Sequence, residues 1–224
     1  MIERAITSIS DYLDALRDNH DPESGATWYR GHARSDWTLL PGFMRITTGI
    51  SETTLLNRFR QSAAMLADKS PRNSFDWMFL MQHYGVPTRL LDWSESPLVA
   101  LYFAVDEFNK HPDADATVWC LKPTLLNRNA NIVDKVEGSY IPSFEDDELK
   151  SYATESVRQN ARIELLPVAT IATRNNPRIQ AQMGMFTIHH NKQIAIEDVG
   201  DQSHVAKYLI PDKSRAALLK ELRL

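Results

Sequence analysis

The sequence is poor in cysteine and in long apolar runs. Its single cysteine, Cys120, excludes an intrachain disulfide. No window approaches the roughly 18 consecutive apolar residues that a membrane-spanning helix needs. No leading segment combines a basic start, an apolar stretch and a small-residue cleavage site. We therefore expect a cytoplasmic protein with no membrane partner.

Common metal and catalytic motifs are also missing. The seven histidines are scattered, and none forms an HExxH motif or stands beside a cysteine cluster, so we expect no metal site. The absence of GxGxxG, GxxxxGK[ST] and GxSxG removes the usual dinucleotide, P-loop and nucleophile-elbow interpretations. Cys120 lies in an apolar strand pattern and is interpreted as an inert core thiol rather than a nucleophile.

The composition is that of a globular chain. With 224 residues and 43% hydrophobic content, it can bury a substantial core, and we expect a single domain over residues 1–224. A net charge of -4 and a pI near 6.0 exclude a global basic field for nucleic acid, although a local basic cleft remains open.

The periodicity of apolar residues predicts helices mainly in the first half and strands mainly in the second half, which favours an α+β fold. The first helix is predicted from Ile6, Ile9, Tyr12, Leu13 and Leu16 on one face, behind a cap at Ser8 or Ser10. Further helices are expected from residue 51, at 74–84, 97–108 and 212–222, strands at 27–31, 117–121, 165–171, 185–189 and 207–210, and an acidic helical connector at 144–158.

Two arginines stand where they can meet an anion. Arg30 precedes Gly31 at a predicted strand end, where a planar fork of donors suits phosphate or carboxylate; the alternative is a structural arginine that bridges a loop carboxylate. Arg89 and Asp92 lie in an apolar extended run and should point to opposite faces. Arg89 either binds a phosphate or ties helix ends together, because a buried charge needs partners.

The predicted helix that begins at Ser96-Pro97 offers a second anion-binding element. Ser94 and Ser96 precede backbone N–H groups at the positive end of the helix dipole, and Ser96 also suits a plain capping role. Tyr102 is placed either against a flat ring or in the core. Further along, Gln182 precedes a glycine, where it can hydrogen-bond a ligand or close its own turn.

These pieces together resemble the FRG domain family, which is named for an (F/Y)RG motif, here Tyr29-Arg30-Gly31. The other matching motifs, ordered within a motif core at residues 28–186, are WTLLP at 37–41 with Arg45, QHYGVPTRLLDW at 82–93, SPLVALYFA at 96–104, and Arg178 with QMGMF at 182–186. The family has long lacked an assigned activity, so the resemblance alone names no reaction.

A more distant resemblance is to ADP-ribosyltransferases, and it implies a split antiparallel β-sheet and NAD as substrate. By that resemblance, Arg30 would bind the pyrophosphate or ribose together with Tyr29 and Gly31, the turn at Ser94 and Ser96 would hold ribose or phosphate, and Tyr102 would stack on nicotinamide. Gln182 would occupy the catalytic position where the transferases carry glutamate. Glutamine can accept a ribose hydrogen bond but cannot act as a base.

Three functional hypotheses follow. The first is an NAD-dependent ADP-ribosyltransferase-like enzyme acting on an intracellular protein or nucleic acid, in the setting of a toxin or phage-defence effector. The second is a noncatalytic module that binds a nucleotide-type small molecule or a partner protein, and Gln182 in place of glutamate favours it. The third is a phosphoesterase or nuclease, for which the sequence offers no paired-carboxylate or histidine-metal pattern.

Overall fold

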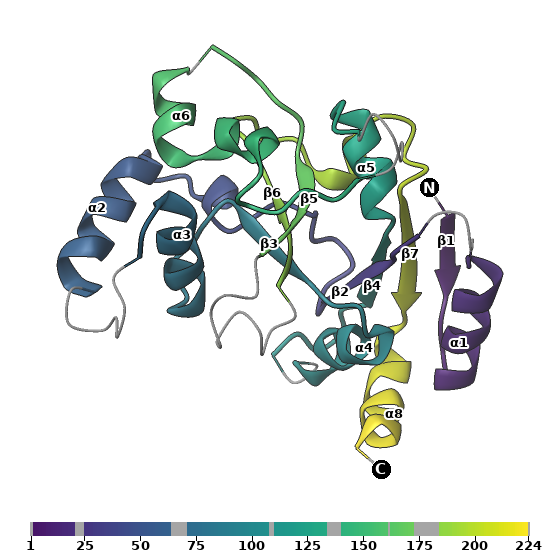
Figure 1. Ribbon diagram of the computed structural model, residues 1–224. Coiled ribbons are helices and arrows are strands. Elements are labelled where there is room, and N and C mark those ends of the chain that lie inside the picture. Colours follow the sequence, from purple (N-terminus) through teal and green to yellow (C-terminus); the bar gives the residue numbers. More distant parts are fainter. Residues whose placement is uncertain are drawn as a thin grey trace. The chain divides into compact units, whose positions relative to one another are not determined.

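The computed structural model has an α+β fold, and the chain divides into two compact units (Figure 1). One unit consists of Met1–Thr38, Asp92–Tyr140 and Glu197–Leu224, and the other of Leu39–Leu91 and Ile141–Ile196. The structure describes residues 2–20, 25–63, 71–107, 110–133, 140–160, 162–172 and 184–223.

The first unit is built on a four-stranded sheet in the order β1-β7-β4-β2. Strand β1 pairs with β7 in parallel, whereas β4 is antiparallel to both β7 and β2. The bounds are Ile2–Ala5 for β1, Trp28–His32 for β2, Ala116–Leu121 for β4 and Val205–Ile210 for β7.

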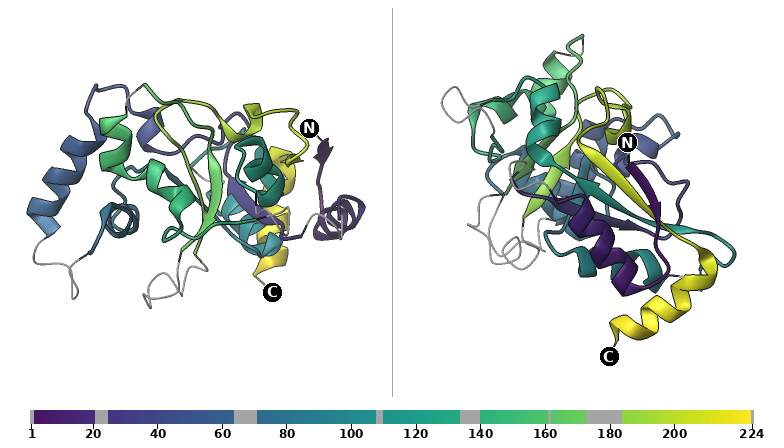
Figure 2. Two further views of the ribbon diagram at one scale, coloured as in Figure 1. Left: turned by 45° about the horizontal axis from the view of Figure 1, so that its top comes forward. Right: turned by 90° about the vertical axis from the view of Figure 1, so that its right-hand side faces the viewer.

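Three helices of this unit share one core with the sheet: α1 (Ile9–Asp18), α4 (Pro97–Asp106) and α8 (Asp212–Leu222). The second view of Figure 2 shows them beside the sheet. Alternate strand residues supply the sheet side of this core, since side chains of a strand alternate between its two faces. They include Val118 and Cys120 of β4 and Ala206 and Tyr208 of β7.

The second unit contains the antiparallel strands β5 and β6 and the first two residues of β3, and the three strands form a sheet in the order β3-β6-β5. Rings of Phe75, Phe79, Phe144 and Phe186 pack on one another there, with centroids 4.9 to 6.2 Å apart. The bounds are Leu90–Trp93 for β3, Val168–Ile171 for β5, Met185–Ile188 for β6, Glu52–Ala63 for α2, Ser74–His83 for α3 and Thr154–Gln159 for α6.

Most expected elements are present. Ser8, one of the two predicted caps, accepts a hydrogen bond from the Asp11 amide at the start of α1. Helix α3 ends just before Gly85, whose φ of 72° is the left-handed conformation typical of a helix stop. The acidic connector is helical as predicted, although it divides into a 3-10 helix, Asp147–Tyr152, and α6.

Several details of the prediction were wrong. Ile6 is buried but precedes α1, and Leu13 is 38% exposed instead of packed on the core face. Strand β1 and helix α5 (Pro123–Asn129) were not anticipated. The strands form two sheets that are not purely antiparallel, because β1 runs parallel to β7. Within the described residues, no helix is long and apolar enough to cross a membrane.

Candidate functional site

The Tyr-Arg-Gly motif lies in β2, at the edge of the four-stranded sheet. On one side β2 pairs with β4 along its whole length. On the other side Tyr29 forms a single antiparallel bridge with Ser94, in which the two N–H groups donate to the two carbonyl oxygens over 2.7 and 2.9 Å. The bridge brings the motif strand next to the turn that precedes α4.

Gly31 is the point where α4 meets β2. A Cβ at this position would lie 2.0 Å from the Ala100 carbonyl oxygen and 2.6 Å from the Ala104 nitrogen. Both neighbours are backbone atoms, so they cannot rotate away as a side chain does. The glycine of the motif is therefore required for close approach of strand and helix, and not for an unusual backbone conformation.

Arg30 projects from the sheet face opposite to Gly31. Its Nη1 donates to the Asp92 carbonyl oxygen over 2.5 Å, and its Nε donates to Nε2 of His32 over 3.1 Å. Nδ1 of His32 lies 3.3 Å from the Trp37 carbonyl oxygen, an arrangement that suits a neutral imidazole with its proton on Nδ1. These contacts hold the guanidinium of Arg30 in a half-buried position.

Arg30 belongs to a row of side chains that crosses the sheet. Trp119 of β4 is paired with Arg30, and Lys207 of β7 is paired with Trp119. The ammonium group of Lys207 lies 5.3 Å from the centroid of the Trp119 ring, in a cation–π contact. Trp119 thus stands between two cationic residues, and Glu3 of β1, which is paired with Lys207, adds a carboxylate to the same row.

Ser94 and Ser96 shape the start of α4. The Ser94 hydroxyl accepts from the Ser96 amide over 3.0 Å, and the Ser96 hydroxyl accepts from the Val99 amide over 3.4 Å. Ser96 is the N-cap and Pro97 occupies the first turn, as predicted from the sequence. The capping role of Ser96 is confirmed, and its role towards a ligand stays a prediction.

The two predicted aromatic ligand contacts pack at the core that the sheet shares with its helices. Tyr29 and Tyr102 are both partly buried against this core. Burial raises the pKa of Tyr29 to about 12, with a smaller contribution from Cys120. The Tyr102 ring meets the edge of Phe103, which is 62% exposed on the outer surface of α4.

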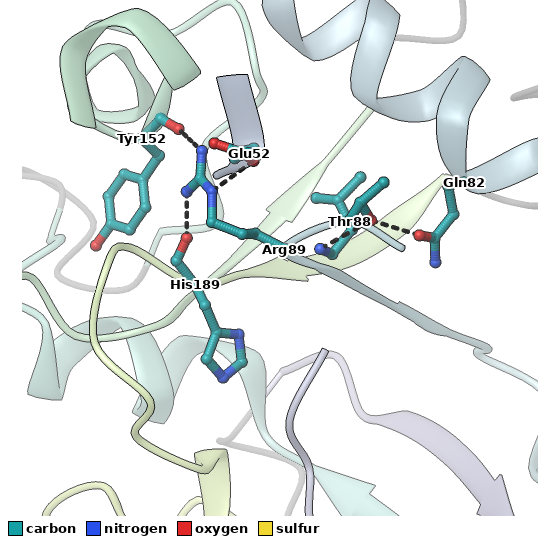
Figure 3. Close-up of polar contacts among 7 residues, drawn as sticks. Glu52, Gln82, Thr88, Arg89, Tyr152 and His189 are labelled. Atoms are coloured by element: carbon teal, nitrogen blue, oxygen red, sulfur yellow. Dashed lines mark hydrogen bonds and ion pairs between the residues drawn. The ribbon is translucent and has the colours of Figure 1, made fainter. Parts of the chain in front are cut away.

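Arg89 lies in the second unit and is completely enclosed (Figure 3). Its Nε forms an ion pair with Oε1 of Glu52 at 2.7 Å, its Nη1 donates to the His189 carbonyl oxygen and its Nη2 donates to the Tyr152 carbonyl oxygen over 2.6 Å. Of the two interpretations of Arg89, these contacts favour the structural one, since each guanidinium nitrogen has a protein acceptor. Asp92 is exposed, as expected for a residue on the opposite face.

A second polar contact explains more of the QHYGVPTRLLDW run at residues 82–93. The Thr88 hydroxyl donates to Oε1 of Gln82 over 2.5 Å and accepts from the Leu90 amide over 3.2 Å (Figure 3). Gly85 stands between them in the left-handed conformation. Gln82 at the end of α3 is thereby tied to the start of β3, and this part of the run acts as a scaffold.

The structure brings six of the predicted site residues into the first unit. Arg89 belongs to the second unit, and Gln182 lies outside the described residues, as does Arg178. The residues of the first unit are Tyr29, Arg30, Gly31, Ser94, Ser96 and Tyr102.

Three residues near Arg30 were missed by the sequence interpretation: His32, Trp119 and Lys207. His32 carried a usable signal, because it follows Arg30 by two positions and so shares its face of the strand. Trp119 and Lys207 carried none, since their place beside Arg30 depends on strand register. In the described ranges, no three His, Cys, Asp or Glu residues are grouped to hold a metal ion.

Comparison with known families gives one match. The model of a family described as the FRG domain matches residues 25–113. This range contains β2, the Gln82 to Trp93 run and α4, so it includes the motifs that surround Arg30 and Arg89. Neither a curated protein nor a solved structure matches the chain.

Proposed function

We propose, from the match of residues 25–113 to the FRG domain, that this FRG-domain protein is an NAD-dependent, ADP-ribosyltransferase-like enzyme. The observation that supports the proposal is the Tyr29–Ser94 bridge, which joins the strand of Arg30 to the turn before α4. The bridge therefore joins the guanidinium group of Arg30 and the positive N-terminal end of the ten-residue helix α4 in one local element. Both attract phosphate groups.

In this proposal, Arg30 orients the pyrophosphate of NAD while the turn at Ser94 and Ser96 accommodates a ribose or phosphate. Tyr29 and Gly31 support the same strand, and Tyr102 packs against the nicotinamide ring. Gln182 accepts a hydrogen bond from a ribose hydroxyl. Arg89 is given no ligand contact, since its contacts to Glu52, Tyr152 and His189 occupy its nitrogens.

The proposed reaction breaks the bond between the nicotinamide nitrogen and C1′ of the ribose. The bonding electron pair leaves with nicotinamide, which departs as a neutral molecule, and the acceptor nucleophile forms the new bond at C1′ and releases its proton to solvent. Because Gln182 cannot remove that proton, the acceptor is expected to be a nucleophile that needs no base, on an intracellular protein or nucleic acid. A toxin or phage-defence effector is the biological setting that such a reaction suits.

A second candidate is a noncatalytic module that binds a nucleotide-type ligand or a protein. The specific observation in its favour is that Arg30 and both serines already make protein contacts: Arg30 donates to the Asp92 carbonyl and His32, and the two hydroxyls cap α4. A residue that holds the fold together in this way can line a binding surface without taking part in a reaction.

The test is to incubate the purified chain with NAD labelled in the adenylate and to measure NAD binding, nicotinamide release and label transfer to candidate acceptors. We expect Arg30→Ala to weaken NAD binding at least tenfold and Gln182→Ala to lower turnover more than binding. Arg34→Ala is the matched control, since Arg34 follows on the same segment and pairs only with exposed Asp36 in the contacts described. Thermal unfolding is measured for each variant, including Arg30→Lys. It distinguishes a variant that fails to fold from one that folds but has lost its contact with NAD.

The outcomes distinguish the candidates. If the chain binds NAD but releases no nicotinamide with any acceptor tried, the enzyme hypothesis is rejected in favour of the noncatalytic binding module. A wild-type chain that neither binds nor consumes NAD removes the proposal, and equal losses in Arg30→Ala and Arg34→Ala remove the role of Arg30.

A further inference from the structure

Helices α2 and α3 of the second unit, which lie side by side in Figure 1, carry aromatic rings that are not fully buried. Phe59 of α2 and Trp77 of α3 are half-buried, and Tyr84, at the C-cap of α3, is 42% exposed. The centroid of the Phe59 ring lies 6.4 Å from that of Trp77 and 6.2 Å from that of Tyr84. Rings therefore continue from one helix to the other where solvent reaches them, and the proposed function uses none of them.

The acidic charges of these two helices are already matched. Their sequences contain two carboxylates, Glu52 in α2 and Asp76 in α3. Glu52 forms the enclosed ion pair with Arg89 at 2.7 Å, and Asp76 pairs with Arg72 at 3.7 Å. Within these two described helices, no carboxylate is left to balance a further cation.

Two further arginines of α2, Arg58 and Arg60, keep an uncompensated positive charge. Among the residues that the structure describes, neither forms an ion pair or donates a side-chain hydrogen bond. Arg58 is exposed. The guanidinium carbon of Arg60 lies 5.2 Å from the centroid of the Trp77 ring, and its Nε is buried with no hydrogen-bond partner. Because a cation–π contact orients a guanidinium group without neutralising it, both arginines remain available to an anionic partner.

Uncompensated arginines beside accessible rings match the two repeating chemical groups of a single-stranded nucleic acid. Its phosphates pair with arginine, and its unstacked bases lay their faces on aromatic side chains. An acidic peptide or an anionic lipid surface would engage the arginines but would offer the rings no flat partner. Since the chain as a whole has a net charge of -4, the attraction of a strand has to come from a local group of cations such as this one.

From these observations, we propose that the α2–α3 surface, formed by Arg58, Phe59, Arg60, Trp77 and Tyr84, binds single-stranded nucleic acid. A base stacks on the exposed ring of Tyr84, and Arg58 and Arg60 hold the phosphates. This inference does not depend on the proposed reaction with NAD, because it uses none of the residues assigned to that reaction.

The experiment is a fluorescence anisotropy titration with the full chain, in the absence of NAD, of a labelled oligothymidylate of about 12 nucleotides, within the site sizes of single-strand binding surfaces. The comparison probes are an abasic strand of the same length and the duplex of the labelled strand. We expect saturable binding of the single strand. The abasic strand should bind at least about fivefold more weakly, because it has no bases to stack. The duplex should also bind more weakly, because its bases are stacked on one another.

Arg58→Gln and Arg60→Gln should each reduce the salt dependence of binding. Each variant removes one phosphate contact, so the slope of log K against log salt concentration should fall in magnitude by about 0.7. The matched control is Arg17→Gln, because the charge of Arg17 is paired with Asp14 at 2.9 Å in the first unit. This variant should leave the slope unchanged.

Tyr84→Ala should weaken binding of the single strand at least about fivefold. Tyr84→Phe keeps the ring and should stay within about twofold of the wild type. Thermal unfolding checks that every variant folds. The comparison of the three probes with the wild-type chain tests the contribution of the bases even if Tyr84→Ala does not fold.

The proposal is overturned by equal affinity for the single strand and the abasic strand, or by tighter binding of the duplex. Equal changes of slope in the variants of Arg58, Arg60 and Arg17 would also overturn it, because they would indicate a general charge effect. Binding of vesicles that contain phosphatidylserine, without binding of the strand, would assign the surface to an anionic lipid membrane instead.

Discussion

Gly31 and Ala100 are in such close contact that a Cβ on the glycine would lie 2.0 Å from the alanine carbonyl oxygen. This contact explains why a strand motif and a helix far along the chain belong to one domain. The motif glycine and the small residues of α4 form a single packing arrangement, and Arg30 is presented on the other face of the same strand.

Gly31→Ala is expected to destabilise the protein by about 3 kcal/mol, because α4 has to move away from β2 to make room for the methyl group. Urea unfolding measures the change. The control is Gly42→Ala, where φ is -55° and the nearest atom to a new Cβ, on Pro87, lies at 3.4 Å. That variant should change stability by less than about 1 kcal/mol. Similar midpoints for the two variants would contradict the packing role of Gly31.

Arg89→Met is expected to cost about 3 to 5 kcal/mol of unfolding free energy, because Glu52 and two carbonyl groups lose their buried partner. Arg89→Lys should not restore stability, since one ammonium group lacks the planar fork that reaches three acceptors. Chemical denaturation provides the measurement.

Arg17→Met is the control for this prediction. Arg17 pairs with Asp14 at 2.9 Å, but the two side chains are 77% and 53% exposed. Exposed pairs contribute about 1 kcal/mol or less. If Arg89→Met were as mild as Arg17→Met, the enclosed position of Arg89 would not be required for the fold.

His189 is expected to make the protein less stable in acid. Burial lowers its pKa from 6.5 to about 3, an effect that the charge of Arg89 reinforces and a backbone contact from Ile194 only partly offsets. Between these two values the unfolded chain binds the proton and the folded chain does not. Stability is therefore lost as the pH falls below about 6.5, by up to about 1.4 kcal/mol per pH unit from this group.

The measurement is the unfolding free energy as a function of pH for the wild-type chain and for His189→Gln. The variant cannot take up this proton, so its stability should fall less steeply between pH 6.5 and pH 3. Parallel curves for the two proteins would show that His189 does not contribute to acid unfolding.

Cys120 is expected to resist alkylation in the folded protein. With a pKa of about 12, only about one thiol in 10,000 is ionised at pH 8, and the thiolate is the reactive form. Mass spectrometry after treatment with iodoacetamide should show almost no modification without denaturant and complete modification in guanidinium. Since the chain has one cysteine, the product reports this position directly. Rapid modification of the native chain would contradict the burial of Cys120.

Local patterns predicted several elements accurately. Ser96-Pro97 predicted the start of α4, and Gly85 predicted the end of α3, because a cap, a fixed φ and a left-handed glycine act within a few residues. The alternation of side chains in an extended segment also predicted that Arg89 and Asp92 face apart. Strand β1 escaped prediction, since four residues, Ile2–Ala5, have little pattern of their own and are held by pairing with β7.

In the candidate site, too, some features were predicted from the sequence and others depend on contacts between distant segments. The sequence alone indicated FRG motifs over residues 28–186, and the family match confirms those that lie within residues 25–113, whereas Arg178 and the motif at 182–186 lie outside it. It also limited Arg30 and Arg89 to two roles each, since a charge in an apolar segment requires partners.

Only the tertiary structure decided what those partners are. Arg89 meets Glu52, Tyr152 and His189, which lie 37, 63 and 100 positions away in the chain. Gly31 meets Ala100, and Trp119 lies beside Arg30 through strand register. Local preferences act over a few residues, whereas these contacts exist because folding brings distant segments into van der Waals and hydrogen-bonding distance.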